Sequence, residues 1–202
     1  MTSNLKQSIL EKLLPEAGFS GWTETALEKA AQTAGYAPTY GRIAFPSGMA
    51  EAADYYINQV DDDMLEALKK LNLSGMKIRE RITAGVWARL ELYTPHKEAV
   101  RTLVSWFALP AHAPSAARHL AHTCDSIWHA AGDNATDYNW YTKRFLLAGV
   151  YSSTLLYWLN DTSENHAETR AFLNRRIENV MQIQKTKGKI AEKFSGLFAR
   201  AG

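Results

Sequence analysis

The sequence predicts an all-α fold. Its 202 residues carry apolar side chains at helical spacing through most of their length. No stretch alternates apolar and polar residues in the way that a half-buried strand does. Glycine, proline and short polar clusters divide the helical patterns into successive elements. The chain is long enough to bury a substantial core, either as one medium domain or as a large domain that carries a small one.

The composition is that of an ordinary globular protein, with a net charge of +2 and 46% hydrophobic residues. This charge gives no general attraction to nucleic acid. The single cysteine, Cys124, precludes an intrachain disulfide and is consistent with a reducing compartment. The N-terminus resembles neither a secretory signal nor an organelle presequence. The most apolar stretch, 145–159, is shorter than the roughly 20 residues of a membrane span. We therefore expect a protein that is soluble or bound to a membrane surface.

Three helices are predicted in the first sixty residues, in the order of a helix-turn-helix unit. The first covers residues 5–14, and Pro15 and Gly18 are expected to end it. The second lies between Thr23, which is a suitable N-cap, and Gly35, which is a suitable C-terminal stop.

The third helix covers residues 48–60, with Ser47 as its predicted N-cap, and it follows a short segment, YGRIAF. Over residues 1–60, six Asp or Glu outnumber four Lys or Arg, and Arg42 is the one cation in the short segment. Proteins that bind DNA derive much of their affinity from clustered cations. The pattern therefore favours a scaffold that no longer reads DNA, with DNA binding as the alternative.

Six further helices are predicted in residues 61–183. Proline-containing loops and the Gly132-Asp133-Asn134 break separate several of them. The predicted ranges are 61–71, 74–93, 96–109, 115–131, 137–159 and 166–183.

The stretch 127–158 is unusually aromatic, with three of the six Trp and four of the nine Tyr. Such residues suit a deep core or a contact surface, and bulky side chains on neighbouring helices also suit an apolar cavity. Composition alone does not separate these interpretations. The residues that we consider for lining such an apolar cavity are Trp87, Leu103, Trp106, Phe107, Trp128, Tyr151 and Leu155.

Residues 184–202 differ in composition from the rest of the chain. They contain five Lys or Arg and one Glu, and their apolar residues recur on one helical face. A basic amphipathic helix is typical of a membrane-surface anchor. The alternatives are a helix that packs on its own protein and a solvated tail. The candidate membrane-binding residues are Lys187, Lys189, Ile190, Lys193, Phe194, Leu197 and Phe198.

Signals for catalysis are weak. His119, His122 and His129 share broadly one face of a predicted helix, which is metal-ligand spacing in principle. No second helix offers a matching acid-and-His motif, so a solvated helix face is the preferred interpretation. Asp133 and Asp137 have no accompanying base or nucleophile signature. We therefore predict no catalytic residue, no metal site and no cofactor; an enzyme using these residues is an alternative that metal analysis would test.

In the N-terminal part, AGFSGWTETALEKAAQTAG is followed by a short predicted helix and then by FPSGMAEAADYY. This arrangement resembles the N-terminal helices of TetR-type regulators. In that family a short aromatic recognition helix leads to a similar turn.

The C-terminal third contains the stretch AGDNATDYNWYTKRFLLAGVYSSTLLYWLNDTSENHAETRAFLNRRIENVMQIQK. This stretch is similar to the signature region of the Coq-nine family of ubiquinone-biosynthesis accessory proteins. The family pattern A-G-D-x-S/T-x-D-F/Y-N-W-Y-T-[KR]-R is followed by L-A-[AG]-[VI]-Y, by D-[ST]-S and by a W/A-F-L-x-[NR]-R helix. The match is nearly continuous over about fifty residues.

This resemblance implies an all-α, TetR-like homodimer that does not bind nucleic acid. It implies a degenerate helix-turn-helix-like part (1–60), a helical lipid-binding and dimerisation domain (61–183) and a membrane-associating helix (184–202). The expected ligand is a lipid or an isoprenoid quinone intermediate. The expected partners are membrane lipids and a demethoxyubiquinone hydroxylase or another hydroxylase of that pathway. The expected location is cytoplasmic, at the inner face of a bacterial membrane.

The family's partner-binding residues carry over to Asp137 and Trp140, with Tyr141 adjacent, and to Ile127 before the Trp-His pair. Of the three histidines only His129 belongs to the motif, which weakens the metal hypothesis further. The remaining alternative is a TetR-like transcriptional regulator with a hydrophobic effector.

Overall fold

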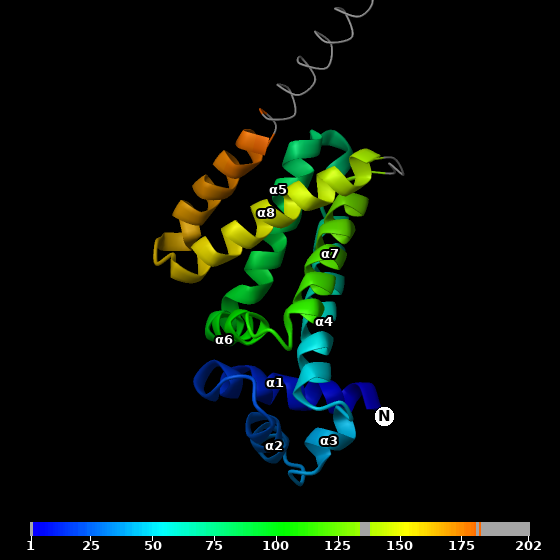
Figure 1. Ribbon diagram of the computed structural model, residues 1–202, viewed down its shortest axis with the longest axis vertical. Helices are drawn as coiled ribbons and strands as arrows, with labels where there is room; N and C mark the ends of the chain where they lie inside the picture. Colours follow the sequence, from blue (N-terminus) through cyan, green and yellow to red (C-terminus); the bar gives the residue numbers. More distant parts are fainter. Residues whose placement is uncertain (1, 134–137, 181, 183–202) are drawn as a thin grey trace, which may run out of the picture. The chain divides into compact units, whose positions relative to one another are not determined.

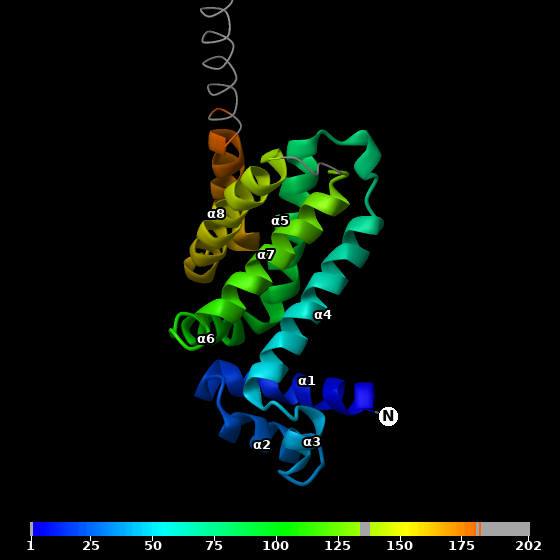
Figure 2. The ribbon, with the colours of Figure 1, turned by 45° about the vertical axis from the view of Figure 1, so that its right-hand side comes forward.

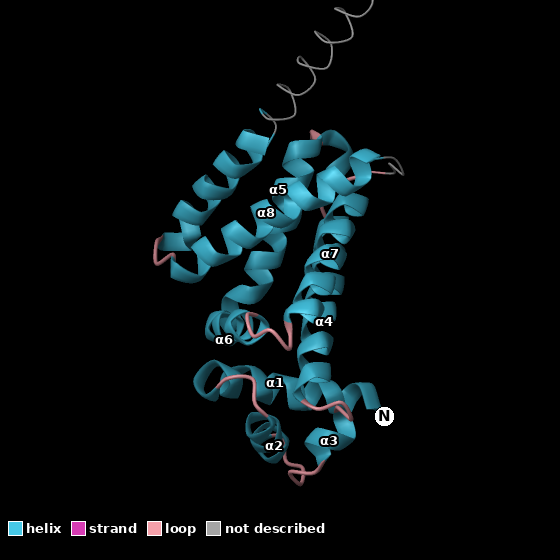
Figure 3. Ribbon diagram, viewed as in Figure 1, coloured by secondary structure: helices cyan, strands magenta, loops and turns pink. Residues whose placement is uncertain are grey.

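The structure is a computed structural model that describes residues 2–133, 138–180 and 182 (Figure 1). No described residue lies in a β-strand, and helices make up most of the described chain (Figure 3). The predicted all-α class is thus confirmed. The chain forms two compact units, residues 1–134 and 135–202.

Seven α-helices and two short 3-10 turns build the first unit. They are α1 (Thr2–Ser20), α2 (Glu24–Thr33), α3 (Tyr40–Ala44), α4 (Met49–Lys69), η1 (Leu73–Gly75), α5 (Ile78–Tyr93), η2 (Thr94–His96), α6 (Lys97–Phe107) and α7 (Ala113–Ala130). Figures 1 and 2 show α1, α2 and α3 grouped at one end, from which α4 runs alongside α5 and α7.

The first helix is longer than predicted, because Pro15 lies inside α1 rather than at its end. A proline removes one helical hydrogen bond and crowds the preceding turn, yet it does not end a helix that tertiary packing holds together. Here Ala17 is buried and its carbonyl accepts from the Thr102 hydroxyl of α6 at 2.9 Å. The indole Nε1 of Trp22 donates to the carbonyl of Ala99 at 2.9 Å, which adds a second link between this region and α6.

One of the two predicted N-caps is confirmed and the other is wrong. The hydroxyl of Thr23 accepts from the N–H of Ala26 at 3.1 Å at the start of α2. Ser47 does not occupy the N-cap position of α4. Instead, the N–H of Met49 donates to the Glu24 carboxylate at 2.8 Å, so a residue from another helix satisfies the first turn of α4.

The helix α4 joins two elements that were predicted as separate helices, 48–60 and 61–71. The apolar pattern is interrupted by Asp61, but this carboxylate is buried and forms an ion pair with Arg89 of α5. Because Arg89 neutralises the Asp61 carboxylate inside the protein, Asp61 can lie on the buried face of α4 together with the apolar residues. The helix therefore runs without a break past residue 60. The predicted domain boundaries at residues 60 and 183 stay predictions.

The second unit contains α8 (Tyr138–Asn160), the turn η3 (Glu164–His166) and a helix over residues 167–180. The rings of Tyr157 and Phe172 stack at 4.5 Å and hold this helix against α8. The Asp161 carboxylate accepts from the N–H of Ser163, and from both the N–H and the hydroxyl of Thr169, at 2.5 to 2.8 Å. These bonds fix the reversal of the chain. Within the described residues, no helix has the length and apolar content needed to cross a membrane.

Candidate functional site

The first two turns of α8 carry an aromatic and cationic cluster. The guanidinium carbon of Arg144 lies 4.0 Å from the centroid of the Trp140 ring, and Nη1 donates to the Trp140 carbonyl at 3.3 Å. The Tyr141 ring meets the Trp140 ring edge-on at 4.7 Å. Arg144 is buried and Trp140 is half-buried, so the cation–π contact holds the indole in one orientation.

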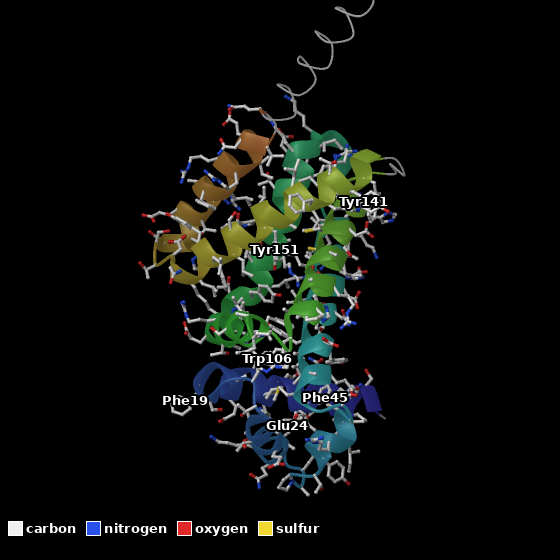
Figure 4. All side chains as sticks on the ribbon, viewed as in Figure 1. Phe19, Glu24, Phe45, Trp106, Tyr141 and Tyr151 are labelled. Atoms are coloured by element: carbon white, nitrogen blue, oxygen red, sulfur yellow. The ribbon has the colours of Figure 1, made fainter. Side chains whose placement is uncertain are left out.

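Two aromatic residues of this helix are exposed to solvent. Tyr141 is 69% exposed and Phe145 is 80% exposed. Their i, i+4 spacing places them on one side of α8, and we call this pair the α8 aromatic face. Figure 4 labels Tyr141 near the start of the helix. Exposed aromatic rings at adjacent positions offer a large contact area at small conformational cost, which suits a protein-binding surface.

The other two predicted partner-binding residues are not seen at a surface. Asp137 lies outside the described residues. Ile127 is 1% exposed and packs against α5, where its Cγ2 lies 2.8 Å from the position that a Cβ of Gly85 would occupy. The prediction that Ile127 belongs to a docking surface is therefore corrected: it is a core residue that brings α7 against α5.

The predicted break after α7 is confirmed at Gly132. This residue has a φ of +89°, which a side chain would disfavour, and its N–H bonds to the carbonyl of His129 at 2.9 Å. The N–H of Asp133 bonds to the carbonyl of Trp128 at 3.0 Å, which completes a Schellman motif. Arg81 adds a bond from Nη1 to the carbonyl of Ala131 at 2.9 Å. The C-terminal end of α7 is thus fixed by hydrogen bonds within its own turn and by one from Arg81 of α5.

The residues predicted to line a lipid cavity are distributed over four helices. Trp106 of α6 stacks on His112 at 3.5 Å and meets Phe107 at 5.1 Å, which brings these two candidates together. Trp87 is half-buried and its Nε1 donates to Glu91 at 2.6 Å. Figure 4 labels Trp106 and Tyr151. Leu103 and Tyr151 are buried, whereas Trp128 and Leu155 are half-buried. A common cavity formed by these residues stays a prediction.

Two of the three candidate histidines of α7, His119 and His122, face carboxylates of α4. His119 Nε2 lies 2.6 Å from Asp54 Oδ1, and His122 Nδ1 lies 3.3 Å from Asp61 Oδ2. In the part of the chain that the structure describes, no three His, Cys, Asp or Glu side chains gather in a way that could hold a metal ion. The arrangement indicates that these histidines connect two helices.

A buried polar cluster between α4, α5 and α7 was missed by sequence reasoning. Arg89 pairs with Asp61 and also donates to the Tyr93 hydroxyl at 2.9 Å. The Thr123 hydroxyl lies 3.1 Å from both Asp61 oxygens and donates to this carboxylate. One signal was available in the sequence, since Asp61 lies four residues after Ile57 and three before Met64, both apolar and at the spacing of one helical face.

The short helix α3 occupies the place of a recognition helix but offers little positive charge. Its one cation, Arg42, forms an ion pair with Glu24 at 3.1 Å. The Tyr36 and Tyr40 rings stack at 5.4 Å, and Ile43, three residues after Tyr40, is exposed to solvent. Phosphate binding needs available cations, so this geometry disfavours DNA recognition.

Comparisons with known proteins agree on a family and a fold. The COQ9 family model matches residues 113–184. The chain is 30% identical over 184 residues to the ubiquinone biosynthesis protein COQ9, mitochondrial, of Drosophila melanogaster, covering 89% of this chain and 56% of that protein. The human protein of the same name is 30% identical over 189 residues, covering 90% and 59%. The probable ubiquinone biosynthesis protein coq9, mitochondrial, of Dictyostelium discoideum is 29% identical over 194 residues, covering 93% and 63%.

The chain therefore spans about three fifths of the length of these relatives. Among solved structures, a TetR transcriptional regulator from Nitrosomonas europaea matches with a TM-score of 0.72 at 20% identity, covering 87% of this chain and 97% of that one. This match confirms the predicted TetR-like fold and indicates nothing about activity.

Proposed function

The chain belongs to the COQ9 family, and on this premise we propose that it is a non-enzymatic accessory protein of ubiquinone biosynthesis. In this proposal it binds an isoprenoid quinone intermediate at the membrane and presents it to a hydroxylase of the pathway. The relatives that carry the name of this pathway match along about nine tenths of the chain or more.

The observation that carries the docking part of the proposal is the α8 aromatic face. It lies inside the segment matched by the family model, residues 113–184. Binding energy at protein interfaces is concentrated in a few residues, among which Trp, Tyr and Arg are enriched. Tyr141 supplies exposed aromatic area, and Arg144 holds Trp140 beside it. A demethoxyubiquinone hydroxylase-like enzyme is the partner that we propose for this surface.

The carrier part of the proposal has a physical basis in the cost of exposing a prenyl chain to water. Each exposed CH₂ group costs roughly 0.8 kcal/mol. A protein that encloses the chain removes this cost while the head group moves toward the enzyme. We propose that the chain does so as a homodimer attached to the inner face of a bacterial membrane. The cationic and apolar residues proposed to attach it, Lys187 to Phe198, lie outside the described residues.

The docking proposal is tested by measuring the affinity of the purified full chain for a demethoxyubiquinone hydroxylase by isothermal titration calorimetry. Tyr141→Ala and Phe145→Ala should each weaken binding about tenfold, which corresponds to about 1.4 kcal/mol. Leu156→Ala is the matched control, since Leu156 is also exposed, at 53%, on the same helix. Equal affinities for the wild type and both aromatic variants would reject this surface as the docking site.

The carrier proposal is tested by extracting lipid from the purified protein and identifying it by mass spectrometry. We expect a prenyl lipid or a phospholipid in stoichiometric amount. Recovery of neither would count against lipid carriage and would leave the docking result to be judged separately.

A further inference from the structure

The chain between α4 and α5 presents apolar and cationic side chains together to solvent. We call residues 69–79 the α4–α5 segment; it contains η1 and lies at the end of α4 away from α1, α2 and α3 (Figure 2). Leu71 is 43% exposed and Ile78 is 45% exposed. Leu73 and Met76, between them in the sequence, are half-buried. Apolar residues that are grouped and exposed in this way indicate a contact surface.

The same segment is strongly cationic. Its charged residues are Lys69, Lys70, Lys77 and Arg79, which are all exposed, and it contains no Asp or Glu. Two carboxylates flank it in the sequence. Glu66 pairs with Lys69 at 2.6 Å, and Glu80 accepts from the N–H of Lys77 at 2.8 Å. The segment therefore keeps an excess of positive charge next to its exposed apolar residues, which is complementary to a surface that is both anionic and apolar.

Hydrogen bonds stabilise the conformation of the α4–α5 segment. The Arg81 guanidinium donates to the carbonyl of Met76 at 2.9 Å and to that of Ser74 at 3.3 Å. It also donates to the carbonyl of Ala131 in α7 at 2.9 Å. The N–H of Met76 donates to the carbonyl of Leu73 at 3.0 Å. Because these backbone groups already have partners within the protein, they lose little when water is removed from around them.

We infer that the α4–α5 segment is a membrane-contact site, which inserts Leu71 and Ile78 among the head groups of an anionic bilayer while its four cations bind lipid phosphates. Apolar side chains gain free energy at the acyl boundary, and each Lys or Arg near an anionic membrane adds to the attraction. A nucleic acid offers phosphates but no apolar interior, so the exposed apolar pair favours lipid.

This site goes beyond the proposed function, which assigns membrane attachment to residues 184–202. It lies in the first unit, at the end of α4 that is away from α1, α2 and α3. A contact at this place directs that end of the first unit toward the bilayer and leaves the three N-terminal helices directed away from it.

The test uses a nitrobenzoxadiazole label, whose fluorescence reports the polarity around it, on the full chain with Cys124→Ala. Ser74→Cys places the label inside the α4–α5 segment and keeps its apolar and charged residues. Gln32→Cys, at an exposed position of α2, carries the control label. Vesicles of equimolar phosphatidylcholine and phosphatidylglycerol should brighten the label at residue 74 severalfold and leave the label at residue 32 unchanged. Vesicles of phosphatidylcholine alone should have little effect on either label.

Matched substitutions test the apolar contribution. Leu71→Ser combined with Ile78→Ser should remove most of the response at residue 74. Phe19→Ser combined with Leu109→Ser should preserve it, because these residues are exposed elsewhere in the same unit. Circular dichroism checks that each variant keeps the helical content of the wild type.

A second pair of variants tests the charge without changing an apolar residue. Lys70→Gln should raise the lipid concentration for half of the response about fivefold, since one cation near the membrane surface is lost. Lys12→Gln, at an exposed position of α1, should leave this concentration unchanged. Equal effects of the two substitutions would overturn the inference, because they would show a dependence on net charge alone.

Flotation of the same labelled proteins with vesicles distinguishes the remaining outcomes. Flotation without a response at residue 74 would overturn the inference and leave attachment through residues 184–202 standing. An equal response after Leu71→Ser and Ile78→Ser would also overturn it. A response to single-stranded RNA but not to vesicles would overturn it in favour of a nucleic-acid site. Absence of flotation would reject both this site and the membrane attachment in the proposed function.

Discussion

Ile127 of α7 packs directly against the backbone of α5 at Gly85. A Cβ atom on Gly85 would lie 2.8 Å from Ile127 Cγ2, which is closer than such atoms approach in folded proteins, and 3.3 Å from its Cγ1, which is also tight. The two helices can therefore lie at this distance only because residue 85 has no side chain.

We expect Gly85→Ala to lower the free energy of unfolding by about 1 to 3 kcal/mol, since α5 and α7 must separate or Ile127 must leave its rotamer. Urea unfolding followed by circular dichroism measures the change. The control is Gly149→Ala in α8, where the added Cβ would meet no atom within 4 Å apart from its chain neighbours and the backbone of its own helix. That substitution should stabilise the helix by up to about 1 kcal/mol. Stabilisation by both alanines would contradict the close packing.

Removal of the Asp61 carboxylate should be among the most damaging single changes. Asp61→Leu leaves the Arg89 guanidinium buried without its counter-charge and should cost about 3 to 5 kcal/mol. The double variant Asp61→Leu with Arg89→Met removes both charges and should regain most of this loss. The free energies of unfolding of the wild type, the single variant and the double variant are measured by urea unfolding. A double variant as unstable as the single one would show that the unpaired charge does not cause the loss of stability.

Acid should weaken the second unit through Asp161. Burial opposes ionisation of this carboxyl, but hydrogen bonds from Ser163 and Thr169 outweigh it and hold the pKa of Asp161 well below its usual value. The native state then binds fewer protons than the unfolded chain. The stabilisation is fully present above the unfolded pKa of about 3.9 and is lost as pH falls through the lower folded pKa.

Asp161→Asn should accordingly lower the Tm at pH 6 and reduce the further fall in Tm between pH 4 and pH 2. Thermal unfolding recorded across this range provides the measurement. Asp62→Asn, which changes an exposed carboxylate of α4, is the control and should keep the wild-type profile. An unchanged acid profile in Asp161→Asn would refute the role of this carboxylate.

Trp140 and Trp158 should respond differently to truncation. Trp140→Ala removes a half-buried ring and its contact with Arg144, with an expected loss of about 1 kcal/mol and weakened hydroxylase binding. Trp158→Ala removes a fully buried indole and should cost about 3 to 5 kcal/mol. Circular dichroism melts and a pull-down with the hydroxylase test both. Unfolding of Trp140→Ala would place this residue in the core and not at a docking surface.

DNA binding should be absent even at low salt. The lone cation of α3, Arg42, is paired with Glu24, and two other cations of the three-helix part, Lys6 and Lys29, pair with Glu51 and Glu16. A gel-shift titration with duplex DNA at low ionic strength should show no complex at micromolar protein. A complex that dissociates as salt is added would favour the alternative of a transcriptional regulator.

The sequence predicted those features of the fold that depend on neighbouring residues. The turn at Gly35, the cap at Thr23 and the end of α7 at Gly132 are set by local backbone chemistry, and all three are found. The features that it did not predict depend on distant partners. Asp61 interrupts the apolar pattern until Arg89, 28 residues later, is known to neutralise it.

The candidate site shows the same division. An i, i+4 pair such as Tyr141 and Phe145 is adjacent by helical geometry alone, although its exposure is a property of the folded protein. Ile127 precedes an aromatic residue in sequence and could have faced either way; its burial is decided by Gly85 on another helix. The pairing of His119 with Asp54 spans 65 residues and was equally invisible in the sequence pattern.

The ion pair between Asp61 and Arg89 also sets how α4 is rotated about its own axis. Apolar side chains can exchange one neighbour for another, so a wholly apolar seam between helices admits several nearly equivalent settings. A carboxylate that meets a guanidinium and the Thr123 hydroxyl has directional bonds, which favour the setting that aligns all three groups. Breaking this buried pair should therefore loosen the orientation of α4 as well as lower the stability of the fold.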